Sequence, residues 1–164
     1  MSKLKHSSPK ITPFLWFDNN AEEAMNFYTS VFKNSSTDSI NRIGKGGHLP
    51  EGSVMICSFT LEGQKFMALN AGPHFKFNEA VSFYVSCENQ EEVDYYWNKL
   101  TAEGGAESQC GWLKDKFGLS WQIIPTALGE LIGDPDREKG GRVMQAMLGM
   151  KKIDISELQE AYDG

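Results

Sequence analysis

The chain has 164 residues, 40% of them hydrophobic and 12% aromatic, with a formal net charge of −6. This length suits one domain that buries roughly two-thirds of its unfolded surface, and the composition is that of a packed globule rather than a disordered chain. The acidic balance and the lack of a Lys/Arg stripe exclude nucleic acid as an expected partner, and no apolar run is long enough for a secretion signal or a membrane span, so we expect a cytoplasmic protein.

The beginning of the chain predicts a strand followed by a helix. Residues 1–9 are expected to form a disordered tail, and the apolar run Lys10–Phe17 predicts a strand that Pro13 interrupts. Apolar side chains then recur at the spacing of one helix face. Asn20, with Glu23 three residues later, has the pattern of a helix-capping pair.

Three further strands are expected before residue 71. Thr37–Ile43 predicts a weak strand, and a glycine-rich loop that carries His48 follows it. Val54–Leu61 and Lys65–Asn70 are apolar runs joined by a short turn, which predicts an antiparallel hairpin. His48 is interpreted as a solvated loop residue or, alternatively, as part of a flap that closes over a ligand.

The same order of elements returns in the second half of the chain. Ala80–Cys87 predicts a strand and Asn89–Glu103 a helix that Asn89 caps. Glu107–Lys114 and Leu119–Ile124 predict a second hairpin. The remaining residues, 126–164, are expected to be helical throughout.

An internal repeat relates the two halves. A shift of 69 residues places Pro13-Phe14-Leu15-Trp16 on Ser82-Phe83-Tyr84-Val85 and aligns the two helix starts. We therefore predict an α+β fold of two βαβββ modules, about 10–70 and 80–125, in one domain at 10–125 with a helical extension at 126–164. The modules are expected to form a curved mixed sheet around a cup, and the alternative is an α+β sandwich with no cavity.

Several sequence stretches are similar to a known family. They are Met67-Ala68-Leu69-Asn70, Gly72-Pro73-His74-Phe75-Lys76-Phe77-Asn78, the run from Cys110 to Ile123, and the terminal Arg142-Val143-Met144 with Lys152-Ile153-Asp154-Ile155. With these the chain resembles the vicinal oxygen chelate superfamily, which has the glyoxalase-like fold, and within it the PhnB-like group labelled 3-demethylubiquinone-9 3-methyltransferase domains.

The resemblance implies where a metal would be held. Superfamily enzymes hold a divalent ion with four inward strand residues, and these positions fall at Pro13, Met67, Ser82 and Gln122. None of the four is a charged or imidazole ligand, so an ion would lack compensating charge. We expect no metal and no cofactor. The methyltransferase label is disfavoured too, because no glycine-rich strand-to-helix turn suited to S-adenosylmethionine opens a helix.

The candidate residues for lining the cup come from the strands and the loop between the modules. His74 and Lys76 would suit an anionic ligand, although a capping loop is the alternative, and Lys114 would bind a carboxylate or phosphate unless it and Asp115 form a solvated turn. The full set is Pro13, Trp16, Met67, Asn70, His74, Lys76, Ser82, Trp112, Lys114, Trp121 and Gln122.

The three cysteines are expected to be reduced thiols in the core. Cys110 would be a nucleophile only if a neighbour lowered its pKa, and no histidine is near it in sequence.

Three functions remain open on the sequence. The first is a metal-independent protein that binds a small molecule in the inter-module cup, as a homodimer. The second is an enzyme of the glyoxalase, dioxygenase or lyase kind with a relocated metal or an acid–base pair such as His74 with Glu79. The third is an assembly protein whose cup is filled by side chains.

Overall fold

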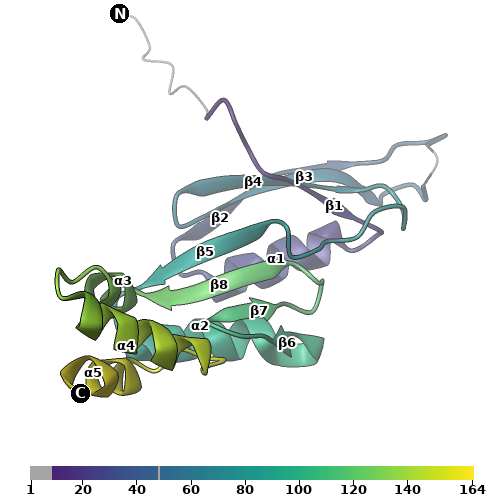
Figure 1. The fold of residues 1–164 in the computed structure, drawn as a ribbon. Helices are drawn as coiled ribbons and strands as arrows, with labels where there is room; N and C mark the ends of the chain where they lie inside the picture. The colour runs from purple at the N-terminus through teal and green to yellow at the C-terminus, as the bar shows by residue number, and fades with distance from the viewer. Residues whose placement is uncertain (1–8, 48) are drawn as a thin grey trace, which may run out of the picture. The chain divides into compact units, whose positions relative to one another are not determined.

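The computed structural model describes residues 9–47 and 49–164, so His48 and almost all of the predicted tail lie outside the described residues. The chain divides into two compact units, the first ending at Lys76 and the second covering Phe77–Gly164. Each unit contains a four-stranded mixed sheet and a helix packed against it, and three more helices follow in the second (Figure 1). The predicted α+β class, the two βαβββ modules and the C-terminal helices are confirmed.

The first unit has the strand order β1-β4-β3-β2. β1 runs parallel to β4, and the other neighbouring pairs are antiparallel. Its elements are β1 (Phe14–Phe17), α1 (Ala21–Val31), β2 (Ser35–Arg42), β3 (Val54–Leu61) and β4 (Gln64–Asn70). The first strand therefore starts at Phe14 rather than at Lys10.

One face of this sheet is buried against α1. Leu15 and Phe17 of β1 are 6% and 3% exposed, whereas the alternate residue Phe14 is 49% exposed. Tyr28 of α1 stacks on Phe59 of β3 with ring centroids 6.0 Å apart. The alternation of a β-strand thus gives the sheet a helix-covered face and an open face.

The start of α1 is capped by a side chain from strand β4. Asn20, the predicted cap, makes no side-chain capping hydrogen bond within the described part of the chain. Instead the Asn70 side-chain oxygen accepts a hydrogen bond of 2.8 Å from the Ala21 backbone N–H. The capping prediction for Asn20 was wrong because the pattern covers only neighbouring residues and does not include a side chain that comes from a distant part of the sequence.

The second unit repeats this design, with the strand order β5-β8-β7-β6 and β5 parallel to β8. Here the predicted cap is confirmed, since the Asn89 side chain accepts a hydrogen bond of 2.9 Å from the Glu92 N–H. The elements are β5 (Ser82–Cys87), α2 (Gln90–Thr101), a 3-10 turn η1 (Ala102–Gly104), β6 (Ala106–Glu107), β7 (Trp112–Lys114) and β8 (Ser120–Pro125).

The two halves correspond at two different shifts. The helix starts Ala21 and Gln90 are 69 residues apart, as predicted, but the strand ends Phe17 and Cys87, which both face their helices, are 70 apart. The turn after β1 is one residue longer than the turn after β5. The strand residue that corresponds to Ser82 is therefore Thr12, not Pro13.

The C-terminal segment forms three helices rather than one continuous run: α3 (Thr126–Ile132), α4 (Arg137–Leu148) and α5 (Ile155–Asp163). Gly133 ends α3, and Pro135 cannot continue a helix. The helices gather at the carboxyl ends of β5 and β8 (Figure 1). They share a core around Ile124, Leu128, Val143, Met150, Ile153 and Leu158.

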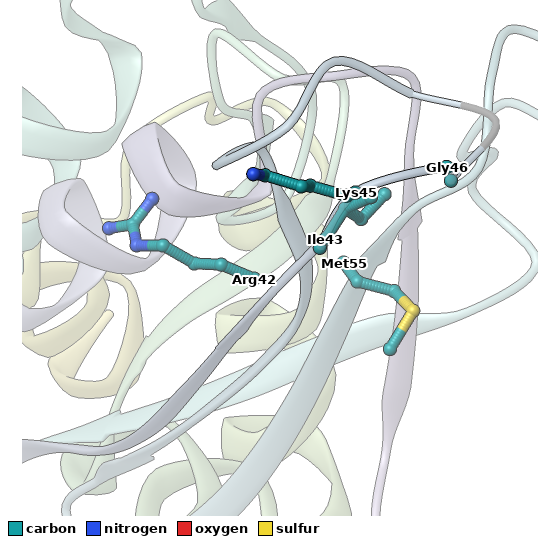
Figure 2. A pocket seen from close by; sticks show the side chains of 7 residues that line it. Arg42, Ile43, Lys45, Gly46 and Met55 are labelled. Atoms are coloured by element: carbon teal, nitrogen blue, oxygen red, sulfur yellow. The ribbon is translucent and has the colours of Figure 1, made fainter.

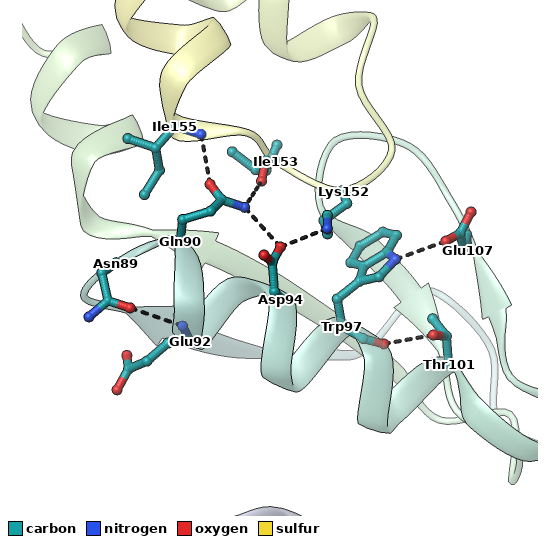
Figure 3. A network of polar contacts seen from close by, with 10 residues as sticks. All are labelled: Asn89, Gln90, Glu92, Asp94, Trp97, Thr101, Glu107, Lys152, Ile153 and Ile155. Carbon is teal, nitrogen blue, oxygen red and sulfur yellow. Dashed lines mark hydrogen bonds and ion pairs between the residues drawn. The ribbon is translucent and has the colours of Figure 1, made fainter.

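A side-chain network fastens the segment before α5 to α2 (Figure 3). The Gln90 amide nitrogen donates to the Ile153 carbonyl at 3.1 Å, and its oxygen accepts from the Ile155 N–H at 2.9 Å. The Lys152 ammonium lies 2.6 Å from the Asp94 carboxylate. This contact, together with a hydrogen bond from Gln90, lowers the pKa of Asp94 below its ordinary value.

The backbone of Cys110 and Gly111 also joins this segment to the sheet. Their N–H groups donate to the carbonyls of Met150 and Lys151 at 2.8 and 2.7 Å. Gly111 has a φ of 81°, and a Cβ there would lie 2.9 Å from the Ile123 carbonyl oxygen. A residue without a side chain is therefore required where β7, β8 and the C-terminal segment meet.

Candidate functional site

The open face of the second sheet carries two rows of side chains across β5, β8 and β7. In the strand register Ser82 pairs with Ser120, and Ser120 pairs with Lys114. One step along, Tyr84 pairs with Gln122, and Gln122 pairs with Trp112. Because paired residues point to the same side of a sheet, a polar row lies beside a row with an aromatic residue at each end.

Two of the sequence-predicted residues are joined directly on this face. The Gln122 side-chain amide donates a hydrogen bond of 2.9 Å to the Ser82 hydroxyl. Both side chains remain partly exposed. Since the hydroxyl accepts this bond, its own proton is left to donate elsewhere.

Ser120 stands out on the same face because its hydroxyl lacks a partner. It is 1% exposed, and its Oγ makes no hydrogen bond to any of the described residues. An unpaired buried hydroxyl costs about 1–3 kcal/mol, so such groups are rare in cores. The sequence analysis missed Ser120, although it lies two residues before Gln122 and alternation alone would have placed it on this face.

Lys114 forms an ion pair at the end of the polar row. Its ammonium contacts the carboxylate of Glu79, which lies just before β5. The hydrogen bond from Lys114 lowers the pKa of Glu79 below its ordinary value. Both side chains are well exposed, at 40% and 60%, so this pair can open at little cost.

Aromatic side chains flank the centre of the second row. Tyr84 is 61% exposed, and Trp112 is partly exposed. They lie on the two strands either side of β8 and thus on either side of Gln122. An exposed tyrosine and tryptophan at the rim of a polar cluster provide flat apolar contact surface.

The first sheet also has an open face, with large apolar side chains on β1 and β4. Met67, Phe14 and Trp16 lie on it, with Met67 paired to Phe14 in the register. The Trp16 indole donates to the Gly72 carbonyl at 2.9 Å, and its ring meets Phe75 edge-on with centroids 4.8 Å apart. Pro13 lies on the other side by alternation. The open face also carries polar groups, since Ser58 pairs with Met67 in the register and its hydroxyl lies 2.7 Å from that of Ser39, while Lys65 lies two residues before Met67 on β4.

Two of the sequence-predicted lining residues point to the helix-covered faces. Asn70 is 6% exposed and bonded to Ala21 and to the Val54 carbonyl. Trp121 is 3% exposed, and its indole donates to the Asp115 carboxylate at 2.9 Å. Asp115 is itself 2% exposed, so it is not the solvated turn residue that the sequence suggested as one alternative. Asn70 and Trp121 therefore have structural roles.

The loop residues His74 and Lys76 are both exposed and lie in the first unit. Glu79, the sequence-predicted partner of His74, belongs to the second unit and is paired with Lys114. His48 lies outside the described residues. The structure thus gives the Glu79 carboxylate an ammonium rather than an imidazole as its contact.

The positions that hold a metal in the superfamily do not fit one here. Thr12, which replaces Pro13 in the corrected register, and Ser82 offer neutral hydroxyls, Gln122 an amide already bonded to Ser82, and Met67 a thioether. Among residues 9–47 and 49–164, no three histidine, cysteine, aspartate or glutamate side chains gather as a metal site. A doubly charged ion would meet no compensating charge from this donor set.

The turns that precede the helices do not suit S-adenosylmethionine either. Asp18-Asn19-Asn20 precedes α1 and Glu88-Asn89 precedes α2, so neither turn contains glycine. Both sheets are mixed rather than doubly wound and parallel. The glycine-rich cradle that a nucleotide-like cofactor needs is missing from these two strand-to-helix turns.

A separate hollow of about 360 Å³ lies at the Gly44–Gly47 loop of the first unit, lined also by Arg42, Ile43 and Met55 (Figure 2). The Arg42 guanidinium lies 2.6 Å from the Glu22 carboxylate and also donates to the Gly52 carbonyl. It points away from the Met55 thioether (Figure 2). Its charge is thus already neutralised within the protein.

The cysteines are free thiols. Cys57 and Cys87 are fully buried, and burial raises their pKa values to about 11 and about 12. Cys110 is partly exposed. Within the described residues, no helix is both long enough and apolar enough to cross a membrane.

Comparison with known structures gives the same fold. The PhnB protein from Bacillus cereus is 43% identical, with a TM-score of 0.66 over 71% of this chain and 99% of that one. A Pseudomonas aeruginosa protein is 20% identical, with a TM-score of 0.61 over 72% and 98%. The fosfomycin resistance protein FosX from Listeria monocytogenes is 15% identical, with a TM-score of 0.51 over 76% and 98%. The last two show the fold alone.

Among curated proteins no relative matched. Residues 9–124 match the family model described as 3-demethylubiquinone-9 3-methyltransferase, so α3, α4 and α5 lie beyond the matched segment. With this match and the 43% identical PhnB protein from Bacillus cereus, the chain belongs to that PhnB-like family.

Proposed function

We propose that this protein binds a small molecule without a metal, on the open face of the second sheet. The observation that supports this most is the polar row, in which the bonded pair Ser82–Gln122 lies beside the unpaired hydroxyl of Ser120. A buried hydroxyl without a partner is explained most simply by a partner that comes from outside the chain. The cup shared by both modules stays a prediction, and the proposal is confined to one sheet face.

The charges on this face favour an organic ligand over a metal ion. Ser82, Gln122 and Ser120 are neutral, and the carboxylate that contacts this row, that of Glu79, is paired with the Lys114 ammonium. These groups offer hydrogen-bond donors, and a cation needs acceptors with negative charge. The same charges weigh against the metal-dependent form of a glyoxalase, dioxygenase or lyase reaction at this face.

The family description is not proposed as the activity. A methyl transfer needs the donor held close to its acceptor, and the turns before α1 and α2 lack the glycines for such a cradle. In the acid–base alternative Glu79 would act together with His74, but the Glu79 carboxylate contacts Lys114 instead. Binding is therefore the function that the described side chains support best.

A fragment screen tests the proposal. Chelator-treated, isotope-labelled protein is titrated with a library of small acids, amides, alcohols and amines, and backbone amide shifts are followed by NMR. We expect hits that shift the amides of Ser82, Ser120 and Gln122 and that weaken in Ser82→Ala. Hits that map to other surfaces, or a library without any hit, would contradict binding at this face.

Two further expectations belong to the same proposal. We propose a homodimer, as the resemblance implies, and a cytoplasmic location, which the sequence pattern favours. Exposed apolar side chains such as Met144 at 38% and Leu148 at 53%, both on α4, are compatible with subunit contact. Light scattering on the eluted protein tests the dimer, and a mass of one chain would contradict it.

A further inference from the structure

We propose that the ligand is a small aromatic carboxylate, which displaces Glu79 from Lys114 and places its ring between Tyr84 and Trp112. This inference rests on the proposed function and names its ligand class. It follows from the order of side chains in the two rows of the open face, each of which crosses β5, β8 and β7.

The polar row has the charge and the hydrogen-bond donors to bind one carboxylate. Lys114 supplies a single positive charge, and the carboxylate that contacts it now, that of Glu79, comes from an exposed position before β5. Ser120, next to Lys114 in the register, has an unpaired hydroxyl, and Ser82 retains a proton to donate. One ammonium with two hydroxyl donors matches the charge and acceptor number of a carboxylate better than those of a dianionic phosphate.

In the free protein the Glu79 carboxylate occupies the position on Lys114 that the carboxylate of the ligand would take. Glu79 and Lys114 are both well exposed, so the contact is weak and open to exchange. The Ser120 hydroxyl is buried and bonded to none of the described residues, so a carboxylate that reaches it when the Lys114–Glu79 pair opens gains a buried hydrogen bond that Glu79 does not make. This difference drives the exchange toward the ligand.

The aromatic part follows from the second row. Residues two apart on a strand are separated by about 7 Å, which is the distance from the polar row to Tyr84, Gln122 and Trp112. Tyr84 and Trp112 lie on strands either side of β8, about 10 Å apart. A planar ring above the Gln122 amide fits between them with a face or edge against each.

The test compares benzoate, benzamide and cyclohexanecarboxylate by calorimetry on the full chain. Benzamide removes the charge, and cyclohexanecarboxylate removes the flat ring. We expect benzoate to bind at least about tenfold more tightly than benzamide, because a charge-assisted hydrogen bond is lost. Cyclohexanecarboxylate is expected to bind more weakly than benzoate.

Three variants separate the parts of the proposal. Lys114→Met is expected to weaken benzoate binding about tenfold or more without changing benzamide binding. Glu79→Gln is expected to tighten benzoate binding roughly two- to fivefold, because a weak surface competitor is removed. Ser120→Ala is expected to weaken benzoate binding while the melting temperature of the free protein stays equal or rises. Lys151→Met, which removes an exposed lysine 3.9 Å from Glu107, is the control and is expected to bind as the parent does.

The outcomes distinguish this inference from the function on which it rests. Equal affinity for benzoate and benzamide, with both mapped to Ser82 and Gln122 by NMR, overturns the carboxylate and leaves small-molecule binding standing. Weaker or unchanged benzoate affinity in Glu79→Gln overturns the displacement. A lower melting temperature in Ser120→Ala would show that the hydroxyl already has a stabilising partner in the free protein, and it would overturn the proposed contact of this hydroxyl with the ligand. Fragment hits confined to other surfaces overturn both.

Discussion

The Asn70 side chain accepts a hydrogen bond of 2.8 Å from the Ala21 backbone N–H across 49 residues of sequence. Its amide nitrogen donates to the Val54 carbonyl at 3.0 Å, so one buried side chain at the end of β4 joins the start of α1 to the start of β3. The loss of this side chain leaves two buried backbone groups without partners.

Replacement of Asn70 is therefore expected to destabilise the first unit strongly. Asn70→Ala should lower the free energy of unfolding by about 2–4 kcal/mol, because two hydrogen bonds are lost and their backbone partners stay buried. Urea denaturation measures it. Asn20→Ala is the matched control and should change stability by less than about 0.5 kcal/mol. A larger effect at Asn20 than at Asn70 would contradict the capping found here.

The bond between Gln122 and Ser82 should also contribute measurably. Ser82→Ala is expected to lower the free energy of unfolding by about 0.5–1.5 kcal/mol, the usual net value of one hydrogen bond. Ser86→Ala, on the same strand and face but exposed, serves as the control in the same urea series. Equal effects at the two serines would show that the pair does not stabilise the sheet.

Gln90 should govern how firmly the C-terminal helices are attached. Gln90→Leu removes bonds to Asp94, Ile153 and the Ile155 N–H, and a loss of about 1–3 kcal/mol is expected. Hydrogen exchange is the measurement, and the Ile155 amide should exchange faster. Gln159→Leu, on the exposed side of α5, should leave that amide protected. Unchanged protection of Ile155 in Gln90→Leu would refute the tether.

The thiols are expected to react in a fixed order. A thiol reacts as its thiolate, and burial holds the pKa values of Cys57 and Cys87 near 11 and 12, so both should be nearly inert at pH 7.5. Brief treatment with iodoacetamide followed by mass spectrometry should find the label on Cys110, which is partly exposed. Label on Cys57 before Cys110 would contradict the burial described here.

Patterns in the sequence predicted most of the elements, but the predicted strand Glu107–Lys114 is two strands, β6 and β7, and the predicted helical segment 126–164 is three helices. The apolar run Val54–Leu61 predicted β3 at the residues found, and the pattern of Asn89 with Glu92 marked the start of α2 correctly. The cap from Asn70 depends on a residue 49 positions away, which no local pattern contains. The Thr12 register depends on a turn one residue longer after β1 than after β5, and a single sequence shift cannot represent such a change.

The candidate site was partly predictable for the same reason. Ser82, Trp112, Lys114 and Gln122 were selected from the sequence, and all four lie on one sheet face. Trp121 was selected with them although alternation sends it to the opposite face from Gln122. Tyr84 and Ser120 were missed, although each lies two residues from a selected residue, Ser82 or Gln122, and alternation alone places them on the same face.

The most direct test of the central claim is the affinity for benzoate, measured by calorimetry before and after dialysis against a chelator, with metal content determined on the same samples. We predict one dissociation constant in both samples and less than roughly one divalent ion per ten chains, because Ser82, Ser120 and Gln122 are neutral donors. Binding that disappears with the chelator and returns with a stoichiometric divalent ion would contradict it.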